Sequence, residues 1–525
     1  MSEALNVFSA IPAQTASARP GEGLCSDQAS GEVNLTPGNQ LQADAIPIVR
    51  KLSDALSEQG IVYTQWKGNY KIHHCGAEGD IDLLIDRSDA ARFTAVLGHL
   101  GFKQAEPPPE RQVPGVFNFY WFDSVAGHFV HVHAYFQIVI GNYRIPVEKA
   151  LLGSASRRKL FPVSSTELEL ILFVVRMALN RSMLNSVFRR IPGDRTKPSR
   201  REELRYLESH SERWRVESIL QQHFPFISRT LFDECKQSLD SHYSQWKRAA
   251  VTRELKRQLK AFARRPQIIE SSAWLARKLK SAIGRRIFFK GSPLKRLTNG
   301  GAIIAVIGGD GAGKTTSVGS LYEWLSGEFW AKRVHFGKPP RALLSLAAFA
   351  TQKIHLSLKF MLKKAASGRT SLGNEHPEFP GYLELLRWLC TARDRYRLYV
   401  RVRRFTAKGG LVVSDRYPVP QTRLMDTPKL RYLSGSRKNH LIDLLIRAEE
   451  KYYLSFTPPD LLIVLRADPA VATSRKSDED AVHVMARSRE VWEADWHGTG
   501  AHIVDANRSK EEVLAEIKAL VCSEL

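Results

Sequence analysis

Cysteine is scarce in this chain, and long apolar runs are missing. The 525 residues contain five cysteines, none of them in a Cys-x-x-Cys pair: Cys25, Cys75, Cys235, Cys390 and Cys522. This usage excludes a disulfide scaffold, does not suit a structural zinc site and predicts a reducing compartment. No apolar run approaches the roughly 18 residues that span a bilayer, which excludes a polytopic membrane protein. Because the first 20 residues also lack the pattern of a secretory signal, we expect a cytoplasmic protein.

Acidic residues are fewer than basic ones, 54 against 77, so the formal net charge is +23. The balance is −5 for residues 1–150, +19 for 151–300 and +9 for 301–525. The basic residues of 247–290, together with the apolar stretch Leu343–Ala350, would be attracted to an anionic membrane surface. A solvated helical face with long cationic side chains explains the same pattern. The inner membrane surface is therefore a candidate partner and peripheral location, whereas we expect no nucleic-acid partner.

The length and the changes in composition along the chain predict several segments. Residues 1–40, rich in Ser, Ala, Gly and Pro, bury too little apolar surface to offset ordering, which predicts a disordered tail. Residues 41–155 combine short strand-like runs with helical stretches, which predicts an α+β domain. Residues 156–296 predict a basic helical region that ends in a linker. Residues 297–525 alternate buried strands and helices, which is typical of an α/β domain with a parallel sheet and helices on both faces.

A glycine-rich loop follows the apolar run at residues 302–307, which suits a central parallel strand. The loop matches the phosphate-binding pattern Gly-x4-Gly-Lys-Thr, in which glycines let backbone N–H groups surround phosphate oxygens. Lys314 would neutralise the β- and γ-phosphates of ATP, and the Thr315 hydroxyl would ligate Mg²⁺. The predicted ATP-binding residues are Gly308, Gly309, Asp310, Gly311, Ala312, Gly313, Lys314, Thr315 and Thr316.

This loop, read as Gly-x-Asp-Gly-x-Gly-Lys-Thr-Thr, resembles the loop of thymidylate kinases. The strand ending in Asp415-Arg416-Tyr417 is similar to the Asp-Arg-Tyr strand of that family, and the resemblance covers roughly residues 300–525. It implies a P-loop kinase that moves the γ-phosphoryl group of ATP to a phosphate-bearing acceptor, in the first place a nucleoside monophosphate such as dTMP. Asp415 would then hold the magnesium shell, and Arg416 would clamp the acceptor phosphate. The implied acceptor-binding residues are Asp310, Arg393, Arg395, Arg416 and Tyr417.

The same resemblance implies a transition-state arginine, which the family places either in the phosphate-binding loop or in the lid. Gly311 stands at the loop position, so the lid must supply the arginine. The candidates are Arg475, Arg487 and Arg489, each of which could also be an ordinary surface residue. Together with Lys314, Asp415 and Arg416 they complete the predicted catalytic set.

Two departures from the thymidylate kinase pattern keep the acceptor open. The strand at 333–336 leads into Gly337-Lys338-Pro339-Pro340 without the acidic–proline pair of the family, and Pro418 and Pro420 follow Tyr417 where the family has base-contacting residues. Related domains occur in proteins of bacterial surface polysaccharide synthesis, so a sugar- or lipid-linked phosphate is an alternative acceptor. A nucleotide-binding switch or scaffold with little turnover is a second alternative, and a homodimer is a candidate assembly.

A second constellation lies in the N-terminal part, where Asp80 and Asp82 flank the start of a strand at 81–85. Carboxylates at i and i+2 share one face and suit Mg²⁺. With the Gly68-Asn69 turn upstream, this resembles poorly characterised bacterial nucleotidyltransferases. We expect His131 or His133 at the third carboxylate position of that family, where imidazole is a poorer ligand for Mg²⁺.

Three interpretations of this N-terminal constellation stay open. In one, Glu78 or a carboxylate from the helical region supplies the third metal ligand. In another, Asp80 and Asp82 are a pair of solvated turn carboxylates. On the main interpretation we expect a bound nucleotide or sugar phosphate with little nucleotidyl transfer.

Overall fold

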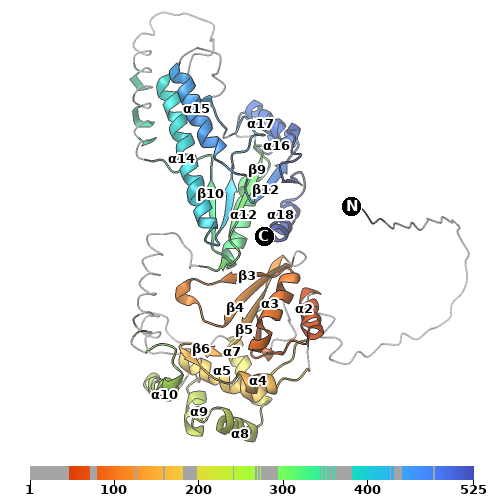
Figure 1. Ribbon diagram of the computed structural model, residues 1–525, viewed down its shortest axis with the longest axis vertical. Helices are drawn as coiled ribbons and strands as arrows, with labels where there is room; N and C mark the ends of the chain where they lie inside the picture. The colour runs from red at the N-terminus through yellow and green to blue at the C-terminus, as the bar shows by residue number, and fades with distance from the viewer. Residues whose placement is uncertain are drawn as a thin grey trace, which may run out of the picture.

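A computed structural model shows two bodies of sheet and helix, one above the other in Figure 1. The described residues are 47–70, 80–123, 127–157, 160–180, 198–240, 242–266, 294–342, 381–425, 427–430, 440–476 and 479–525, with shorter pieces at 269, 272 and between 345 and 361. The tail expected at 1–40 and the basic pairs expected beyond residue 266 lie outside the described residues.

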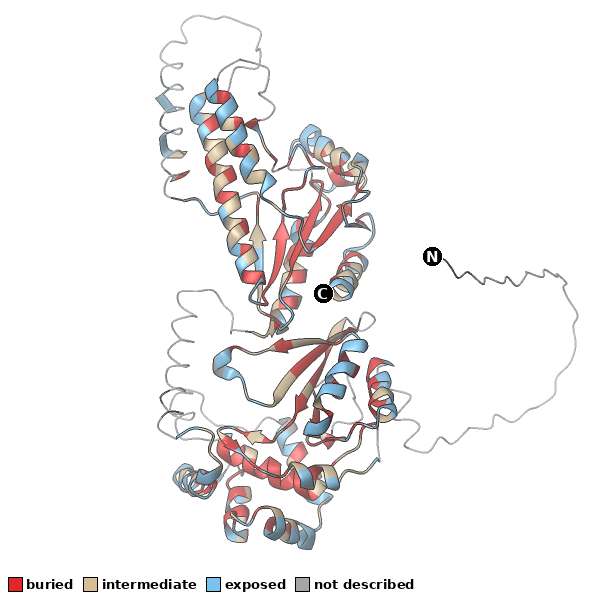
Figure 2. Cartoon of the chain, viewed as in Figure 1, coloured by how far each residue is buried: buried red, intermediate tan, exposed pale blue. Residues whose placement is uncertain are grey.

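The C-terminal body contains a five-stranded parallel sheet in the order β10-β11-β9-β12-β13. Its three central strands are apolar and almost wholly buried, as Figure 2 shows in red, and they correspond to the continuous apolar runs of the sequence. The strands are β9 (Ile303–Gly308), β10 (Ala331–His335), β11 (Leu411–Asp415), β12 (Leu461–Arg466) and β13 (Ala501–Asp505). The predicted parallel α/β sheet is therefore confirmed.

Helices cover both faces of this sheet. α12 (Lys314–Glu328) and α18 (Lys510–Glu524) pack on one face, and α14 (Tyr382–Thr406) and α17 (Ala481–Glu493) pack on the other. α15 (His440–Leu454) lies along α14, and the short α16 (Pro469–Ser474) precedes α17. The sheet thus holds its loops at the carboxyl ends of the strands, where P-loop proteins bind nucleotides.

The N-terminal body contains a mixed sheet in the order β1-β2-β5-β4-β3-β8, in which only β2 and β5 are parallel. α2 (Pro47–Glu58) and α3 (Ala90–His99) share an apolar cluster with one face of the sheet. The strands are β1 (Tyr63–Gln65), β2 (Ile81–Ile85), β3 (Lys103–Glu106), β4 (Val116–Asp123), β5 (His128–Tyr135) and β8 (Arg296–Leu297). β6 (Val139–Ile140), β7 (Tyr143–Arg144) and α4 (Glu148–Gly153) follow β5, and the 3₁₀ turns η2 (Arg87–Asp89) and η3 (Pro109–Arg111) lie between strands.

The predicted helical region packs against the other face of this sheet through α5. α5 is buried on nearly all sides, because Leu84 and Tyr135 of the sheet and the later helices surround it. The helices are α5 (Thr166–Asn180), α7 (Pro198–Ser209), α8 (Arg213–His223), α9 (Arg229–Gln237), α10 (Gln245–Gln258) and η4 (Leu259–Phe262). One apolar cluster therefore contains residues from both sides of the expected domain boundary at 155/156. The boundary itself stays a prediction.

Not every basic residue of the helical region belongs to a solvated face. Arg248 of α10 is buried, and its guanidinium donates hydrogen bonds to the backbone carbonyls of Ser238 and Asp240 at 2.9 and 2.6 Å. Its neighbour Lys247 is exposed. In this basic pair, the guanidinium of Arg248 therefore makes hydrogen bonds inside the protein and is not presented to a partner.

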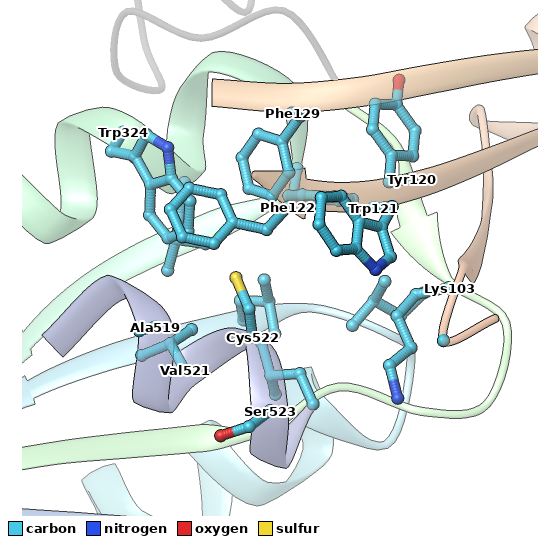
Figure 3. Close-up of a pocket in the computed structure, with 16 residues that line it drawn as sticks. Lys103, Tyr120, Trp121, Phe122, Phe129, Trp324, Ala519, Val521, Cys522 and Ser523 are labelled. Carbon is cyan, nitrogen blue, oxygen red and sulfur yellow. The ribbon is translucent and has the colours of Figure 1, made fainter. Parts of the chain in front are cut away.

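The two bodies meet where a linker was expected. Residues 296–297 form β8, which pairs with β3 of the N-terminal sheet before the chain enters β9. Trp324 of α12 contacts Phe122 and Phe129. Phe329, which follows the helix, contacts Tyr120 and Phe129. A cavity of about 260 Å³ lies at this junction (Figure 3), lined by aromatic side chains of the N-terminal sheet and by residues of α12 and α18. None of the predicted phosphate-binding residues lines it.

In the part of the chain that the structure describes, no helix combines the length and the apolar character needed to cross a membrane.

Candidate functional site

The phosphate-binding loop lies between β9 and α12, at the middle of the parallel sheet. β9 ends at Gly308, and α12 begins at Lys314, as the motif requires. β11 is hydrogen-bonded to β9 and ends at Asp415, so the Asp-Arg-Tyr segment follows the strand next to the loop. The two sequence motifs are therefore brought to neighbouring strand ends, as parallel pairing dictates.

Two glycines of the loop approach the lid helices too closely to carry a side chain. A Cβ at Gly311 would lie 2.2 Å from the carbonyl oxygen of Ala472 in α16, and the φ of Gly311 is +83°. A Cβ at Gly309 would lie 2.6 Å from Cα of Ser488 in α17. The Ser488 hydroxyl in turn donates a hydrogen bond of 2.9 Å to the carbonyl of Asp310. An arginine at position 311 could not be accommodated here.

Asp310 lies at the centre of three cationic side chains. Its carboxylate is buried and is 2.7 Å from Arg487, 3.3 Å from Arg416 and 3.5 Å from the Lys314 ammonium. Lys314 also donates a hydrogen bond of 2.5 Å to the carbonyl of Gly309. The Asp415 carboxylate also interacts electrostatically with Lys314. Three positive charges therefore face two carboxylates, and the net positive charge would attract an anion.

The pKa values in this cluster follow from burial and charge. Burial disfavours the ionised form of Asp310, but the hydrogen bond from Arg487 and the charges of Lys314 and Arg416 outweigh it and lower its pKa. Burial lowers the pKa of Lys314, although the neighbouring carboxylates oppose the shift. The Asp310 carboxylate is therefore held ionised among its cations.

Asp415 and Thr315 offer oxygen atoms that suit Mg²⁺. Asp415 is buried, and among the described residues its Oδ1 atom has no hydrogen-bond partner. Thr315, in the first turn of α12, is exposed. Mg²⁺ is bound by few protein oxygens and completes its shell with water and substrate phosphates, so this donor set fits the ion. The metal roles of both residues stay predictions.

Of the three lid arginines, the structure brings Arg487 to the phosphate-binding loop. The Arg475 guanidinium instead donates a hydrogen bond of 2.9 Å to the carbonyl of Ala506. Arg489 is exposed and pairs with Glu493 in the next turn of α17 at 3.5 Å. Sequence spacing could not separate the three, because their orientation depends on how α16 and α17 pack against the loop.

The predicted acceptor-binding residues divide between the loop and the core. Arg416 reaches Asp310 from a backbone with φ of 57°, a left-handed conformation that a non-glycine residue rarely adopts. Such strain is often found at functional sites. Tyr417 is buried, and its hydroxyl donates a hydrogen bond of 2.7 Å to the Thr457 carbonyl. That hydroxyl is therefore engaged inside the protein.

The two arginines of α14 that were predicted to bind the acceptor contact neighbouring groups of the protein. Arg395 is buried and donates a hydrogen bond of 2.9 Å to the carbonyl of Phe336, at the end of β10, and another to the Tyr453 hydroxyl. Arg393 lies 3.8 Å from Asp394, whose other oxygen accepts a hydrogen bond from the Ala342 N–H. Arg395 thus positions the turn after β10, and contact of either arginine with an acceptor stays a prediction.

In the N-terminal body, Asp80 and Asp82 face histidines rather than a third carboxylate. His131 Nδ1 is 2.6 Å from Asp80, and His133 Nδ1 is 3.4 Å from Asp82. Burial opposes the ionisation of Asp80, but the contacts with His131 outweigh it and lower its pKa to about 2. For His131, burial disfavours the protonated imidazolium and lowers the pKa. Among the described residues no group of three or more His, Cys, Asp or Glu could hold a metal ion. Glu78 lies outside these residues, and the metal role of Asp80 and Asp82 stays a prediction.

Two residues near this N-terminal cluster were not named from the sequence, although a carboxylate from the helical region was left open as an alternative. The Lys67 ammonium is 2.9 Å from Asp82 and donates a hydrogen bond of 3.1 Å to the Tyr135 hydroxyl. Glu169 of α5 is buried and accepts a hydrogen bond of 2.7 Å from the Asn69 side chain. Burial raises the pKa of Glu169 to about 7. An acidic residue inside the apolar run at 168–179 is a sequence signal that could have indicated Glu169.

Comparisons with known proteins point to one family. No family model matches the chain. The thymidylate kinase of Xanthomonas campestris pv. campestris (strain B100) is 30% identical over 239 residues, which cover 44% of this chain and 86% of the relative. The thymidylate kinase of Thiobacillus denitrificans (strain ATCC 25259 / T1) is 27% identical over 239 residues, with coverages of 42% and 96%.

Two further similarities come from Escherichia coli and from a solved structure. YghR of Escherichia coli (strain K12), described as an uncharacterized ATP-binding protein, is 24% identical over 223 residues, with coverages of 42% of this chain and 86% of YghR. A solved thymidylate kinase of Candida albicans is 17% identical and covers 43% of this chain and 92% of its own, with a TM-score of 0.27. Each of these matches spans less than half of the chain.

Proposed function

Because the chain belongs, over less than half of its length, to the thymidylate kinase family, we propose that it is an ATP- and Mg²⁺-dependent phosphotransferase acting on a phosphate-bearing acceptor. The observation that carries the proposal is the cluster of Lys314, Arg416 and Arg487 around the buried carboxylate of Asp310. Lys314 is buried at the first residue of α12, and the half-buried Arg416 and Arg487 face the same carboxylate. Three cations converging beside a helix start suit the phosphates of a nucleotide better than a neutral ligand.

The residues would act mainly by positioning and by neutralising charge. Backbone N–H groups of the loop and the Lys314 ammonium would bind the β- and γ-phosphates, and Arg487 would meet the charge that develops on the γ-phosphoryl group. When bound between Thr315 and Asp415, Mg²⁺ would supply further positive charge to the phosphate oxygens. Arg416 would orient the acceptor phosphate, whose oxygen needs no strong base to attack.

We take a nucleoside monophosphate, dTMP first, as the leading acceptor, because the relatives at 27% and 30% identity are thymidylate kinases. The segment Gly337-Lys338-Pro339-Pro340 after β10 lacks the acidic–proline pair of that family. This difference favours a sugar- or lipid-linked phosphate as the second candidate acceptor.

Release of ADP by the full chain, with ATP, Mg²⁺ and a panel of phosphorylated acceptors, tests the proposal. Lys314→Ala should reduce acceptor-dependent release by about a hundredfold or more, because it deletes a charge that contacts the transferred group. Asp415→Asn should chiefly reduce the Mg²⁺-dependent turnover. Lys510→Ala is the matched control, since Lys510 is also the first residue of a helix but is exposed.

The outcome also separates the enzyme from a nucleotide-binding switch. A switch would bind ATP through Lys314, yet no acceptor would accelerate ADP release. Acceptor-dependent turnover at the parent rate in Lys314→Ala would instead refute the donor-site assignment.

A further inference from the structure

Large apolar side chains are exposed at the outer end of the α14–α15 pair, the end farthest from the N-terminal body in Figure 1. The first turns of both helices pack together through a small cluster that includes Leu385, Ile442 and Ile446. The outward-facing residues beside this cluster are exposed by 38% to 56%: Tyr382, Leu383, Leu386, Leu441 and Leu444. The cluster below them is already filled, so these side chains do not belong to the internal core.

The chain before α14 adds a second exposed apolar row. Residues 354, 357, 358 and 361 are helical, and Ile354, Leu358 and Met361 are exposed by 60%, 53% and 68%. Their spacing of four and three residues places them on one side of a helix. The Phe349 ring, which belongs to the same segment, lies 5.6 Å from the Arg387 guanidinium of α14.

The sequence segments that carry these side chains are rich in basic residues. Residues 341–390 and 429–447 together contain twelve Lys or Arg and four Asp or Glu, a net charge of +8. The stretch 341–370 alone has six basic residues and no acidic one. Exposed apolar side chains beside cationic ones are the combination that binds the interface of an anionic membrane.

We propose that this outer surface, formed by Tyr382, Leu383, Leu386, Leu441 and Leu444 with the row at Ile354, Leu358 and Met361, docks on an anionic membrane. A second copy of the chain fits less well, because a symmetric dimer through this end would bring two basic surfaces together. An anionic bilayer offers both complements at once, since its headgroups attract the cations and its acyl boundary accepts the apolar side chains.

Docking would bring the membrane close to the predicted acceptor site. Arg393 lies seven residues after Leu386 in the same helix, a separation of about 10 Å along the axis. The inference itself does not depend on the proposed kinase activity, because binding to a membrane can be measured without turnover.

Flotation of the full chain with phosphatidylcholine vesicles, with and without phosphatidylglycerol, tests the inference at low and high salt. We expect flotation only with phosphatidylglycerol, and less of it at high salt. Leu441→Ser/Leu444→Ser should reduce binding by about tenfold, because two apolar side chains no longer enter the interface. Leu454→Ser/Val482→Ser is the matched control, as these residues are exposed by 85% and 73% outside the proposed surface.

Circular dichroism of each variant shows whether it is folded, which the exposure of the changed residues leads us to expect. No flotation of the folded parent at low salt, or equal flotation of the surface variant and the parent, would overturn the proposal. A dimer that forms without vesicles and is lost in Leu441→Ser/Leu444→Ser would identify a second copy as the occupant instead.

Discussion

Arg487 differs from Arg475 and Arg489 in the partner of its guanidinium, and this difference predicts distinct effects of substitution. We expect Arg487→Ala to lower the rate of phosphoryl transfer by about a hundredfold or more, because its charge would stabilise the transition state. Arg489→Ala should leave the rate nearly unchanged, since Arg489 pairs on the surface with Glu493. Single-turnover rates of ADP formation for the parent and both variants measure the difference.

Arg475→Ala provides a structural comparison for the same experiment. Its guanidinium holds the Ala506 carbonyl, so the substitution should lower the melting temperature more than the transfer rate. Equal loss of transfer in Arg487→Ala and Arg489→Ala would contradict the assignment of Arg487.

At this scale the sequence predicts chemistry better than geometry. Lys314 and Asp415 are indicated by motifs whose spacing is fixed by a strand, a loop and a helix. The engaged hydroxyl of Tyr417 and the buried guanidinium of Arg395 depend on contacts with Thr457 and Phe336, which are 40 and 59 residues away in the chain. Local pattern carries no information on such contacts.

Among the elements, the long apolar ones were predictable and the short ones were not. β9, β11 and β12 are central strands with residues buried on both faces, so each reads as a continuous apolar run. β8 contains two residues within the expected linker and forms because β3 offers an unpaired edge. A two-residue strand has no periodicity, so pairing alone determines it.

α5 contains a buried carboxylate, which makes the stability of the protein depend on pH. Burial raises the pKa of Glu169 to about 7 from its ordinary value of 4.5. The folded state therefore retains a proton that the unfolded state releases, and stability falls as pH rises from about 4.5 to 7. Relative to Glu169→Gln, the parent should lose about 3 kcal/mol of unfolding free energy between acidic and mildly alkaline pH.

Urea denaturation of the parent and of Glu169→Gln over this range measures the effect. Gln keeps an oxygen that can accept the hydrogen bond from the Asn69 side chain but does not titrate, so the change of the difference with pH reports the charge of Glu169. Glu202→Gln is a suitable control, because Glu202 is exposed on α7. A difference between parent and Glu169→Gln that is constant with pH would show that Glu169 keeps an ordinary pKa.

In the whole molecule, α12 connects the two candidate sites. Lys314 at its first residue belongs to the phosphate-binding loop, and Glu328 at its last accepts a hydrogen bond of 3.0 Å from Tyr120 of the N-terminal sheet. The Tyr120 ring stacks on His131 with centroids 4.3 Å apart, and His131 contacts Asp80. The N-terminal cluster is thus packed against the helix that carries the donor site, although its chemistry differs.

That difference predicts binding without nucleotidyl transfer at the N-terminal cluster. Transfer through two metal ions needs several carboxylates, whereas Asp82 is already neutralised by Lys67 at 2.9 Å, and Asp80 faces His131. Neutral imidazole is a poor ligand for Mg²⁺. We therefore expect little pyrophosphate release by the full chain with any nucleoside triphosphate and a panel of acceptors, measured in a Lys314→Ala background so that the donor site is silent.

Calorimetry should still detect nucleotide or sugar phosphate binding that Lys67→Ala weakens. Robust pyrophosphate release that disappears in Asp80→Ala/Asp82→Ala would establish a working transferase and refute this expectation.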